Sequence, residues 1–272
     1  SRRRHTRFRN VTGVQTCALP IYLDAVSEAD LLAIAKQQRS LGLNGRPNYV
    51  RDDITGQQKL GRFGWKANQP GLTQQVAAAH IGDMGITSSL YQTQNCPKVQ
   101  AQCLAAHQTG KHELADTSWK AVTLFLAAVE PPKRPMPQSE AYINGEKLFR
   151  AASCNHCHVP ELKTGKFPLL PAIENKSFFP YTDLLLHDMG EDLADSRPDF
   201  AAGGRDWRTA PLWGIGLSPR VNGSMNLLHD GRARNVLEAI LWHGGEAKKS
   251  RDRFAAMKKE ERDQLIAFVH AL

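Results

Sequence analysis

The sequence predicts a mainly α-helical fold in two parts. Apolar residues recur at helical spacing in several segments, and no stretch alternates polar and apolar residues long enough to indicate a half-buried strand. The segment 131–137, which reads PPKRPMP, cannot continue a helix because proline lacks a backbone N–H and fixes φ. A chain of 272 residues can supply two modest domains. We therefore expect 22–130 to be the remainder of an N-terminal domain, 131–138 a linker, and 139–272 a second domain.

The first 21 residues are expected to be disordered and foreign to the protein. Residues 11–21 back-translate, codon by codon, to a common short-read sequencing adapter, so the segment resembles a read-through artefact. A targeting peptide is the alternative, but the segment lacks an apolar core and a small-residue cleavage site. If the genuine sequence starts near Tyr22, it starts inside a longer protein, and its signal peptide is expected to be lost.

If residues 1–21 are foreign, the net charge of the protein itself is smaller than that of the whole sequence. The formal net charge is +8, and the arginines at 2, 3, 4, 7 and 9 supply +5 of it, since residues 1–21 contain no acidic residue. The remaining charge of about +3 gives no indication of a nucleic-acid partner or a membrane surface. The sequence contains no run of 18 apolar residues, so we expect no transmembrane segment.

The elements before the linker follow from capping and periodicity. Ser27 is a plausible N-cap for a short helix around residues 31–35. Residues 42–70 are rich in Gly, Asn and Pro and are expected to be irregular. Helical patterning returns at 72–81 and at 118–129, where six side chains are expected to form a buried face: Trp119, Val122, Leu124, Phe125, Leu126 and Val129.

A helix over 139–152 leads to the most informative stretch of the chain, Cys154-Asn155-His156-Cys157-His158. This C-x-x-C-H spacing lets two thiols form thioethers to the vinyl groups of one c-type haem, with His158 as the proximal iron ligand. A thioredoxin-like redox pair or half of a zinc site are the alternatives. The first needs a βαβ pattern and the second a further ligand pair, and neither is evident.

The chain closes with an amphipathic helix expected over 253–272. Helix, haem motif, long loops and closing helix together predict a cytochrome c-like C-terminal domain with one covalent haem c. Two further cysteines, Cys96 and Cys103, flank Pro97 in a polar loop. Because haem c is attached outside the bacterial cytoplasm, where disulfides persist, we expect them to form a local disulfide; two structural thiols are the alternative.

Five longer segments of the sequence resemble one protein family, which is more specific information than the fold class. The segments 61–67, 82–88, 180–190, 207–214 and 228–233 read GRFGWKA, GDMGITS, PYTDLLLHDMG, WRTAPLWG and LHDGRA. They resemble the di-haem thiol oxidoreductase family, which is similar to bacterial di-haem cytochrome c peroxidases and the related tryptophan-modifying enzymes. The resemblance runs from about residue 23 to 272. The family carries two C-x-x-C-H motifs and this chain has one, so the first motif, and a second haem, are expected upstream of Tyr22.

The resemblance implies a division of labour between the two haems. In the peroxidases the N-terminal haem reacts with peroxide and the C-terminal haem feeds it electrons. Trp65 matches the region of the tryptophan between the haems, with core packing as the alternative. Asp83 resembles the acidic residue beside the peroxide site, where a buried carboxylate with a raised pKa can shuttle a proton. A helix or turn cap is the alternative for Asp83.

The second axial ligand must come from elsewhere in the C-terminal domain. His243 falls where the peroxidases place a distal methionine or tyrosine, at the end of the helix after an H-D-G turn. Met225 and an open site are the alternatives. His229 is expected to form hydrogen bonds near a haem edge or propionate. Arg208 and Arg232 are candidates for pairing with propionates, with solvated surface arginines as the alternative.

Three classes of function follow from these residues. The first is the electron-transfer half of a periplasmic di-haem oxidoreductase of the peroxidase type. The second is a mono-haem electron-carrier cytochrome, and the third a non-catalytic haem-binding partner protein. The expected partners are redox proteins and a small oxidant such as peroxide. Whether this chain is itself an enzyme depends on the haem that it lacks.

Overall fold

The computed structural model describes residues 20–106, 111–130, 139–168 and 170–272. Helices dominate, and the described strands form three antiparallel two-stranded sheets of two or three residues per strand. The prediction of a mainly α-helical chain is therefore confirmed. The predicted linker 131–138 lies outside the described residues, as do residues 1–19. Helix α2 (Pro20–Asp24) begins two residues before the expected start at Tyr22.

The N-terminal half contains the predicted helices and one short hairpin. Helix α3 (Glu28–Ser40) starts at the predicted N-cap, where the Ser27 hydroxyl accepts a hydrogen bond from the Asp30 N–H. Strands β1 (Tyr49–Arg51) and β2 (Gln58–Leu60) pair within the segment expected to be irregular. Helices α4 (Leu72–Met84), α5 (Ala101–Ala105) and α6 (Asp116–Ala128) follow. Cys96 and Cys103 form a disulfide that closes the loop before α5.

Helix α6 buries a different face from the predicted one. Its buried residues are Trp119, Thr123 and Ala127, which repeat every four residues and form one stripe. Leu124 and Phe125 are 52% and 70% exposed. The narrow stripe fits against α4 because Thr123 and Ala127 are small and the Thr123 hydroxyl bonds to the Trp119 carbonyl. The predicted face is therefore confirmed for Trp119, which is buried, and Leu126 is partly buried against the core. It is wrong for Val122, Leu124 and Phe125, which are exposed.

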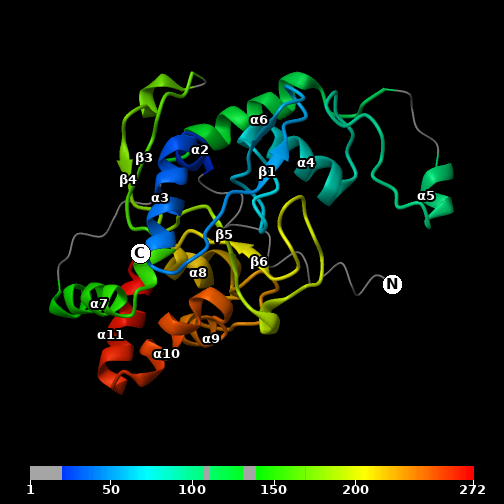
Figure 1. Ribbon diagram of the computed structural model, residues 1–272. Coiled ribbons are helices and arrows are strands. Elements are labelled where there is room, and N and C mark those ends of the chain that lie inside the picture. Colours follow the sequence, from blue (N-terminus) through cyan, green and yellow to red (C-terminus); the bar gives the residue numbers. More distant parts are fainter. Residues whose placement is uncertain (1–19, 107–110, 131–138, 169) are drawn as a thin grey trace.

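The C-terminal half centres on the contact between α7 (Glu140–Ala151) and α11 (Lys259–His270), which lie side by side at the lower edge of Figure 1. Ser139 caps α7 by accepting from the Tyr142 N–H. Phe149 and Phe268 pack with ring centroids 5.5 Å apart. Strands β3 (Leu162–Lys163) and β4 (Ser177–Phe178) form a hairpin, and β5 (Leu186–Asp188) pairs with β6 (Asp206–Arg208). Helices α8 (Ser218–Asn222), α9 (Val236–Leu241) and α10 (Lys248–Ala256) complete the chain.

The closing segment is two helices, and the prediction of one helix over 253–272 is corrected. Helix α10 ends at Ala256 because Met257 takes an extended conformation, with φ −66° and ψ 152°. The Glu261 carboxylate accepts from the Lys258 N–H and restarts the chain as α11. The predicted apolar face survives the break: Phe254, Leu265, Phe268, Val269 and Leu272 are buried.

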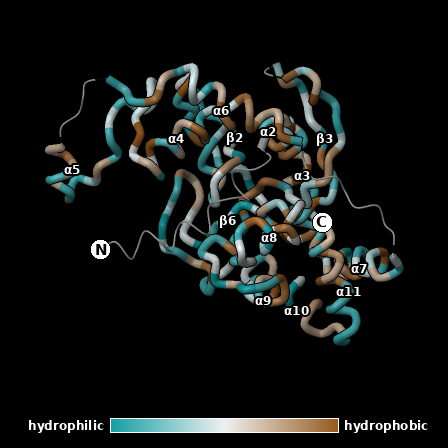
Figure 2. Tube along the Cα trace, turned by 180° about the vertical axis from the view of Figure 1, so that it is seen from behind, coloured by the Kyte–Doolittle hydropathy of each residue, from teal (hydrophilic) through white to brown (hydrophobic). Residues whose placement is uncertain are grey.

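Two apolar cores divide the molecule. One joins α2, α3, α4 and α6 to side chains from beyond the predicted linker: Leu162, Ile173, Phe178, Leu184 and Trp213. The second lies between α7, α9, α10 and α11. Figure 2 shows the hydrophobic segments of α6 and α2 at one end of the molecule and those of α9, α10 and α11 at the other. No helix among the described residues is long and apolar enough to cross a membrane.

Gly145 allows the close approach of α7 to α11. A Cβ atom there would lie 2.4 Å from the Gln264 carbonyl oxygen and 2.6 Å from Phe268 Cβ. Gly82 in α4 is the matched control for Gly145, because it is also a helix-interior glycine but a Cβ atom there would meet nothing within 4 Å.

We expect Gly145→Ala to lower the free energy of unfolding by about 1–3 kcal/mol, because the added methyl group overpacks the helix contact. Gly82→Ala is expected to raise it by about 0.5–1 kcal/mol by removing a helix-interior glycine. Urea denaturation of the full chain followed by circular dichroism measures both. Equal effects of the two substitutions would show that α7 and α11 do not approach as described.

Candidate functional site

The C-x-x-C-H motif, residues 154–158, directly follows the end of α7; we call residues 153–158 the attachment loop. Ala152 stops the helix, and Ser153 takes the left-handed conformation with φ +64°. One turn of 3-10 helix, Cys154–His156, then turns the chain so that the His158 N–H bonds to the Cys154 carbonyl at 2.9 Å. This turn places both thiols and the imidazole on one wall of a cavity.

His158 is held as a neutral ring through its Nδ1 atom, and no hydrogen bond links its Nε2 atom to another of the described residues. Its Nδ1 atom lies 3.0 Å from the Tyr181 carbonyl oxygen, which can only accept, so Nδ1 carries the proton. Burial, with the nearby His243 ring as a second cause, lowers the pKa of His158 to about 4. A neutral imidazole with its outer nitrogen fixed by a carbonyl is the form that binds a metal ion.

His243 presents the same arrangement from another element. It follows the last turn of α9, and its Nδ1 atom lies 2.7 Å from the Ala239 carbonyl oxygen. Burial lowers the pKa of His243. The ring centroids of His158 and His243 are 6.4 Å apart. Two imidazoles that bind one metal ion through bonds of about 2 Å, with rings of about 1 Å radius, have centroids about 6 Å apart.

The cavity between these rings has a volume of about 600 Å³. Its walls are largely apolar, and both free thiols, Cys154 and Cys157, lie in them. Burial raises the pKa of Cys154 to about 12 and also raises the pKa of Cys157, so both are uncharged thiols. A haem group therefore fits the residues present: two thiols for its edge, two imidazoles for its iron and an apolar surround. Met225 is buried in the adjoining core and does not line the cavity.

Three glycines bring His243 to this position. A Cβ atom on Gly190 would lie 2.8 Å from the Gly245 nitrogen, and one on Gly244 would lie 2.7 Å from the Met189 carbonyl oxygen. Gly245 also has φ +49°, and a Cβ atom on it would lie 2.1 Å from the Asp188 carbonyl oxygen. Only glycine permits this backbone contact between the end of β5 and the segment after α9. The contact fixes His243 on one side of the glycine pair and Glu246 on the other.

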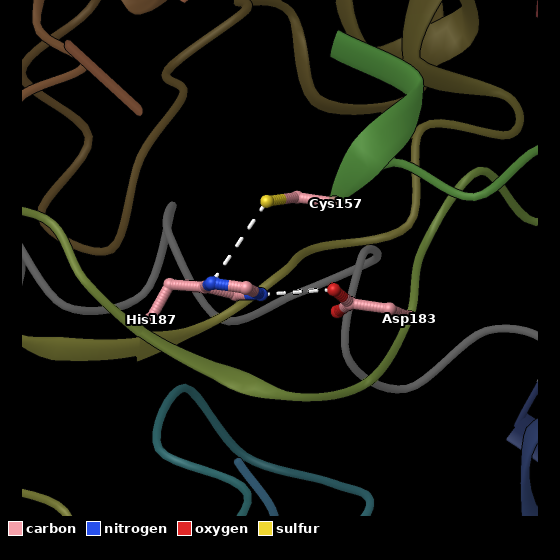
Figure 3. Close-up of side chains that lie close together, drawn as sticks. All are labelled: Cys157, Asp183 and His187. Carbon is pink, nitrogen blue, oxygen red and sulfur yellow. Dashed lines mark hydrogen bonds and ion pairs between the residues drawn. The ribbon is translucent and has the colours of Figure 1, made fainter. Parts of the chain in front are cut away.

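A buried polar cluster lies beneath the second thiol (Figure 3). His187 is 2% exposed; its Nε2 atom lies 2.8 Å from Asp183 Oδ2, and its Nδ1 atom lies 2.9 Å from Glu246 Oε2. Cys157 Sγ is 3.8 Å from the same Nδ1 atom. The Gln38 amide of α3 donates to Asp183 and to the His156 carbonyl. The cluster therefore joins three separate segments to the attachment loop.

This cluster is an ion-pair network, and its geometry does not converge on one metal position. Ligand atoms of Cys157, Asp183 and His187 lie within 4.8 Å of one another. However, the imidazole ring separates Asp183 from Cys157 and Glu246, and one ion cannot bind both ring nitrogens. Burial alone lowers the pKa of His187, but the Asp183 and Glu246 carboxylates outweigh burial and raise that pKa well above its usual value. The ring is accordingly a buried imidazolium.

The predicted tryptophan lies in the cavity wall beside a second aromatic group. Trp65 lines the cavity, as do Trp207 and His229, whose rings stack with centroids 3.6 Å apart. The Lys66 ammonium lies 4.4 Å from the centre of the Trp207 ring and is 2.7 Å from Asp195 Oδ1. His229 is therefore fixed by stacking, and burial lowers its pKa.

Arg208 is a buried cation that faces the cavity. Its Nε atom donates to the Gly64 carbonyl and Nη1 to the Thr209 carbonyl. Burial lowers the pKa of Arg208 to about 10. No carboxylate of the described residues forms an ion pair with it within 4 Å. An anionic group bound in the cavity would supply the missing charge.

Two predicted site residues lie elsewhere. Arg232 is exposed, pairs with Asp230, donates to the Asp192 carbonyl and covers the Trp242 ring, so it does not line the cavity. Asp83 is exposed near the end of α4, also outside the cavity. The expected proton transfer depends on a buried Asp83 carboxylate, and the structure shows that Asp83 is exposed.

Sequence reasoning missed the partners of His187. That histidine stood out only as part of the phrase 180–190, and Asp183 precedes it by four residues in the same phrase. Glu246 and Gln38 are distant in sequence and carry no local motif. The Gly244-Gly245 pair before Glu246 was the available signal, because paired glycines indicate a close backbone approach.

Comparison with known proteins gives one family. The model described as "Di-haem oxidoreductase, putative peroxidase" matches residues 6–272. A search of curated proteins found no match. A solved chain of Kuenenia stuttgartiensis hydrazine synthase, pressurised with 20 bar xenon, is similar with 18% identity and a TM-score of 0.36. The similarity covers 60% of this chain and 57% of that one, and a score this low carries no weight for fold or function.

The buried imidazolium predicts a stability that depends on pH. Because the folded pKa of His187 exceeds the unfolded value of about 6.5, its contribution is full below that pH and is lost as pH rises through the folded pKa. We expect His187→Gln to cost about 3–5 kcal/mol at about pH 6, and less as the pH rises. Denaturation of the full chain between about pH 6 and about pH 9 measures this.

The exposed His112 provides the control, and His112→Gln should change the free energy of unfolding by well under about 1 kcal/mol. A cost of His187→Gln that increases with pH would contradict the buried imidazolium.

Proposed function

The chain belongs to the di-haem oxidoreductase family, and on that premise we propose that it is a c-type haem protein of electron transfer. One haem is bound covalently at Cys154 and Cys157. The observation that carries this proposal is the pairing of His158 and His243. Both rings use Nδ1 to bond to a backbone carbonyl, and both line one cavity with the two thiols.

The chain holds its cofactor from several sides. When bound, the haem supplies a one-electron redox couple. Cys154 and Cys157 would anchor its edge, and His158 and His243 would bind its iron. Arg208 would compensate the charge of its propionates, and the apolar walls would exclude water. A second imidazole in place of a thioether gives a low potential among c-type haems.

The position of His243 favours electron transfer over reaction with peroxide. The closely packed Gly190, Gly244 and Gly245 hold His243 in place, and a haem bound by both His158 and His243 would have no open position for peroxide. We propose that this chain is the electron-transfer half of a di-haem, peroxidase-like oxidoreductase whose reactive haem binds at another C-x-x-C-H motif. Trp65, in the cavity wall, is the group proposed to face that haem. A mono-haem carrier or a non-catalytic haem-binding partner is the alternative, and genomic sequence upstream of Tyr22 distinguishes them.

The proposed compartment is the periplasm. Covalent haem attachment takes place outside the bacterial cytoplasm, and the Cys96–Cys103 disulfide is of the kind that persists there.

Expression of the full chain with a haem c maturation system should give one covalent haem per chain by the pyridine haemochrome assay. Cys154→Ala with Cys157→Ala should abolish attachment, because no thioether can form. Cys96→Ala with Cys103→Ala removes the same number of sulfur atoms from the disulfide and should retain the haem. A haem that extracts into acid acetone from the unaltered chain would refute covalent attachment.

His243→Ala should convert a low-spin, six-coordinate ferric spectrum into a high-spin or water-bound one and allow carbon monoxide to bind the ferrous form. His243→Met should keep six-coordination and raise the potential. Met225→Ala is the control and should leave the spectrum low-spin, because Met225 does not line the cavity. Conversion by Met225→Ala but not by His243→Ala would assign the ligand to Met225.

A further inference from the structure

The cavity has a positively charged edge that the proposed haem site does not use. Three side chains from α10 line the cavity together with the haem-binding residues: Lys249, Arg251 and Arg253. We call these three residues the basic rim. Helix α10, with the sequence KKSRDRFAA, has four basic residues and one acidic residue.

The basic rim lies beside the attachment loop. Arg253 Nη1 donates to the hydroxyl of Ser153, the residue before the first thiol. The rim therefore borders the loop that carries the two thiols, whereas Arg208 reaches the cavity from β6.

The neighbouring acidic groups leave a positive excess. Asp252 is paired with both Lys248 and Arg251. Glu246 is the other acidic group on the adjoining segment, and it is held by His187 and by the Asn44 N–H. Lys249 and Arg253 are exposed, and no ion pair within 4 Å is formed by either with a carboxylate of the described residues.

An apolar side chain accompanies the charges. Leu41, directly after α3, also lines the cavity and is 47% exposed. A small apolar contact surrounded by like charges is suited to a brief encounter with a protein of opposite charge. The charged side chains are spread along α10, over a surface larger than one small anion would cover.

We propose that the basic rim and Leu41 form the docking surface for an acidic electron-transfer protein. The partner's carboxylates face Lys249, Arg251 and Arg253, and its own cofactor lies near the thioether edge of the haem. This inference deepens the proposed function and rests on it. Opposite charges would steer the encounter and make binding weaken as salt rises.

The test measures binding of oxidised flavodoxin, an acidic redox protein, to the haem-loaded full chain by titration calorimetry at low and high salt. Lys249→Glu with Arg253→Glu should weaken binding by about tenfold or more at low salt and remove most of the salt dependence. Lys249→Gln with Arg253→Gln, which removes charge without reversing it, should have an intermediate effect.

Lys163→Glu with Lys176→Glu is the matched control. Both lysines are exposed on the β3–β4 hairpin, which stands apart from α10 in Figure 1, and neither lines the cavity. This pair makes the same change in net charge and should weaken binding by less than about twofold. Equal weakening by both pairs would show attraction to net charge and overturn the docking surface.

Carbodiimide cross-linking gives an independent readout, because it joins a partner carboxylate to a lysine amine in contact with it. The cross-linked peptide should contain Lys249, and cross-links at Lys163 or Lys176 in its place would overturn the proposal. The haem content and the low-spin spectrum of every variant distinguish a failure of the proposed function from a failure of the docking surface. A chain without covalent haem refutes the proposed function, and a haem-loaded chain that binds independently of the rim refutes only the docking surface.

Discussion

The buried imidazolium of His187, held between Asp183 and Glu246, is the interaction on which the rest of the structure depends. Around it meet α3 through Gln38, the strand that carries His187, the segment after α9 and the attachment loop. Apart from α3, these segments are short or irregular and could not fix their own orientation. Loss of any charge would leave the others buried without compensation, which costs several kcal/mol. The network therefore selects one arrangement of the loops around the cavity.

Backbone contacts provide the second constraint. Gly145 sets the distance between α7 and α11, and the Gly244-Gly245 pair sets the distance between β5 and the end of α9. Together they help determine where His158 and His243 lie. His158 is anchored to the distant Tyr181 carbonyl, and His243 to the carbonyl of Ala239 in α9. The distance between the His158 and His243 rings is thus set mainly by the packing of helices and strands, and only slightly by side-chain flexibility.

Much of this could be predicted from local sequence. The caps Ser27 and Ser139, the ends of α7 and the attachment motif all depend on residues a few positions apart, and His243 followed from a family phrase. The buried face of α6 could not be predicted, because apolar residues occur all around that helix and packing selected the stripe of Trp119, Thr123 and Ala127. The break at Met257 and the partners of His187 depend on contacts between distant residues. Neither leaves a periodic signal in the sequence.

The pairing of His158 with His243 has a consequence for chain entropy. If one iron binds both rings, it closes a loop of roughly 85 residues, in the way that a disulfide does. For a loop of that length, cross-linking removes conformational freedom from the unfolded chain worth about 4–5 kcal/mol. The iron would thus act as a clip between the attachment loop and the C-terminal helices. The stability of α10 and α11 would then depend on whether the metal is bound by both rings, although no covalent cross-link of the polypeptide ties them to His158.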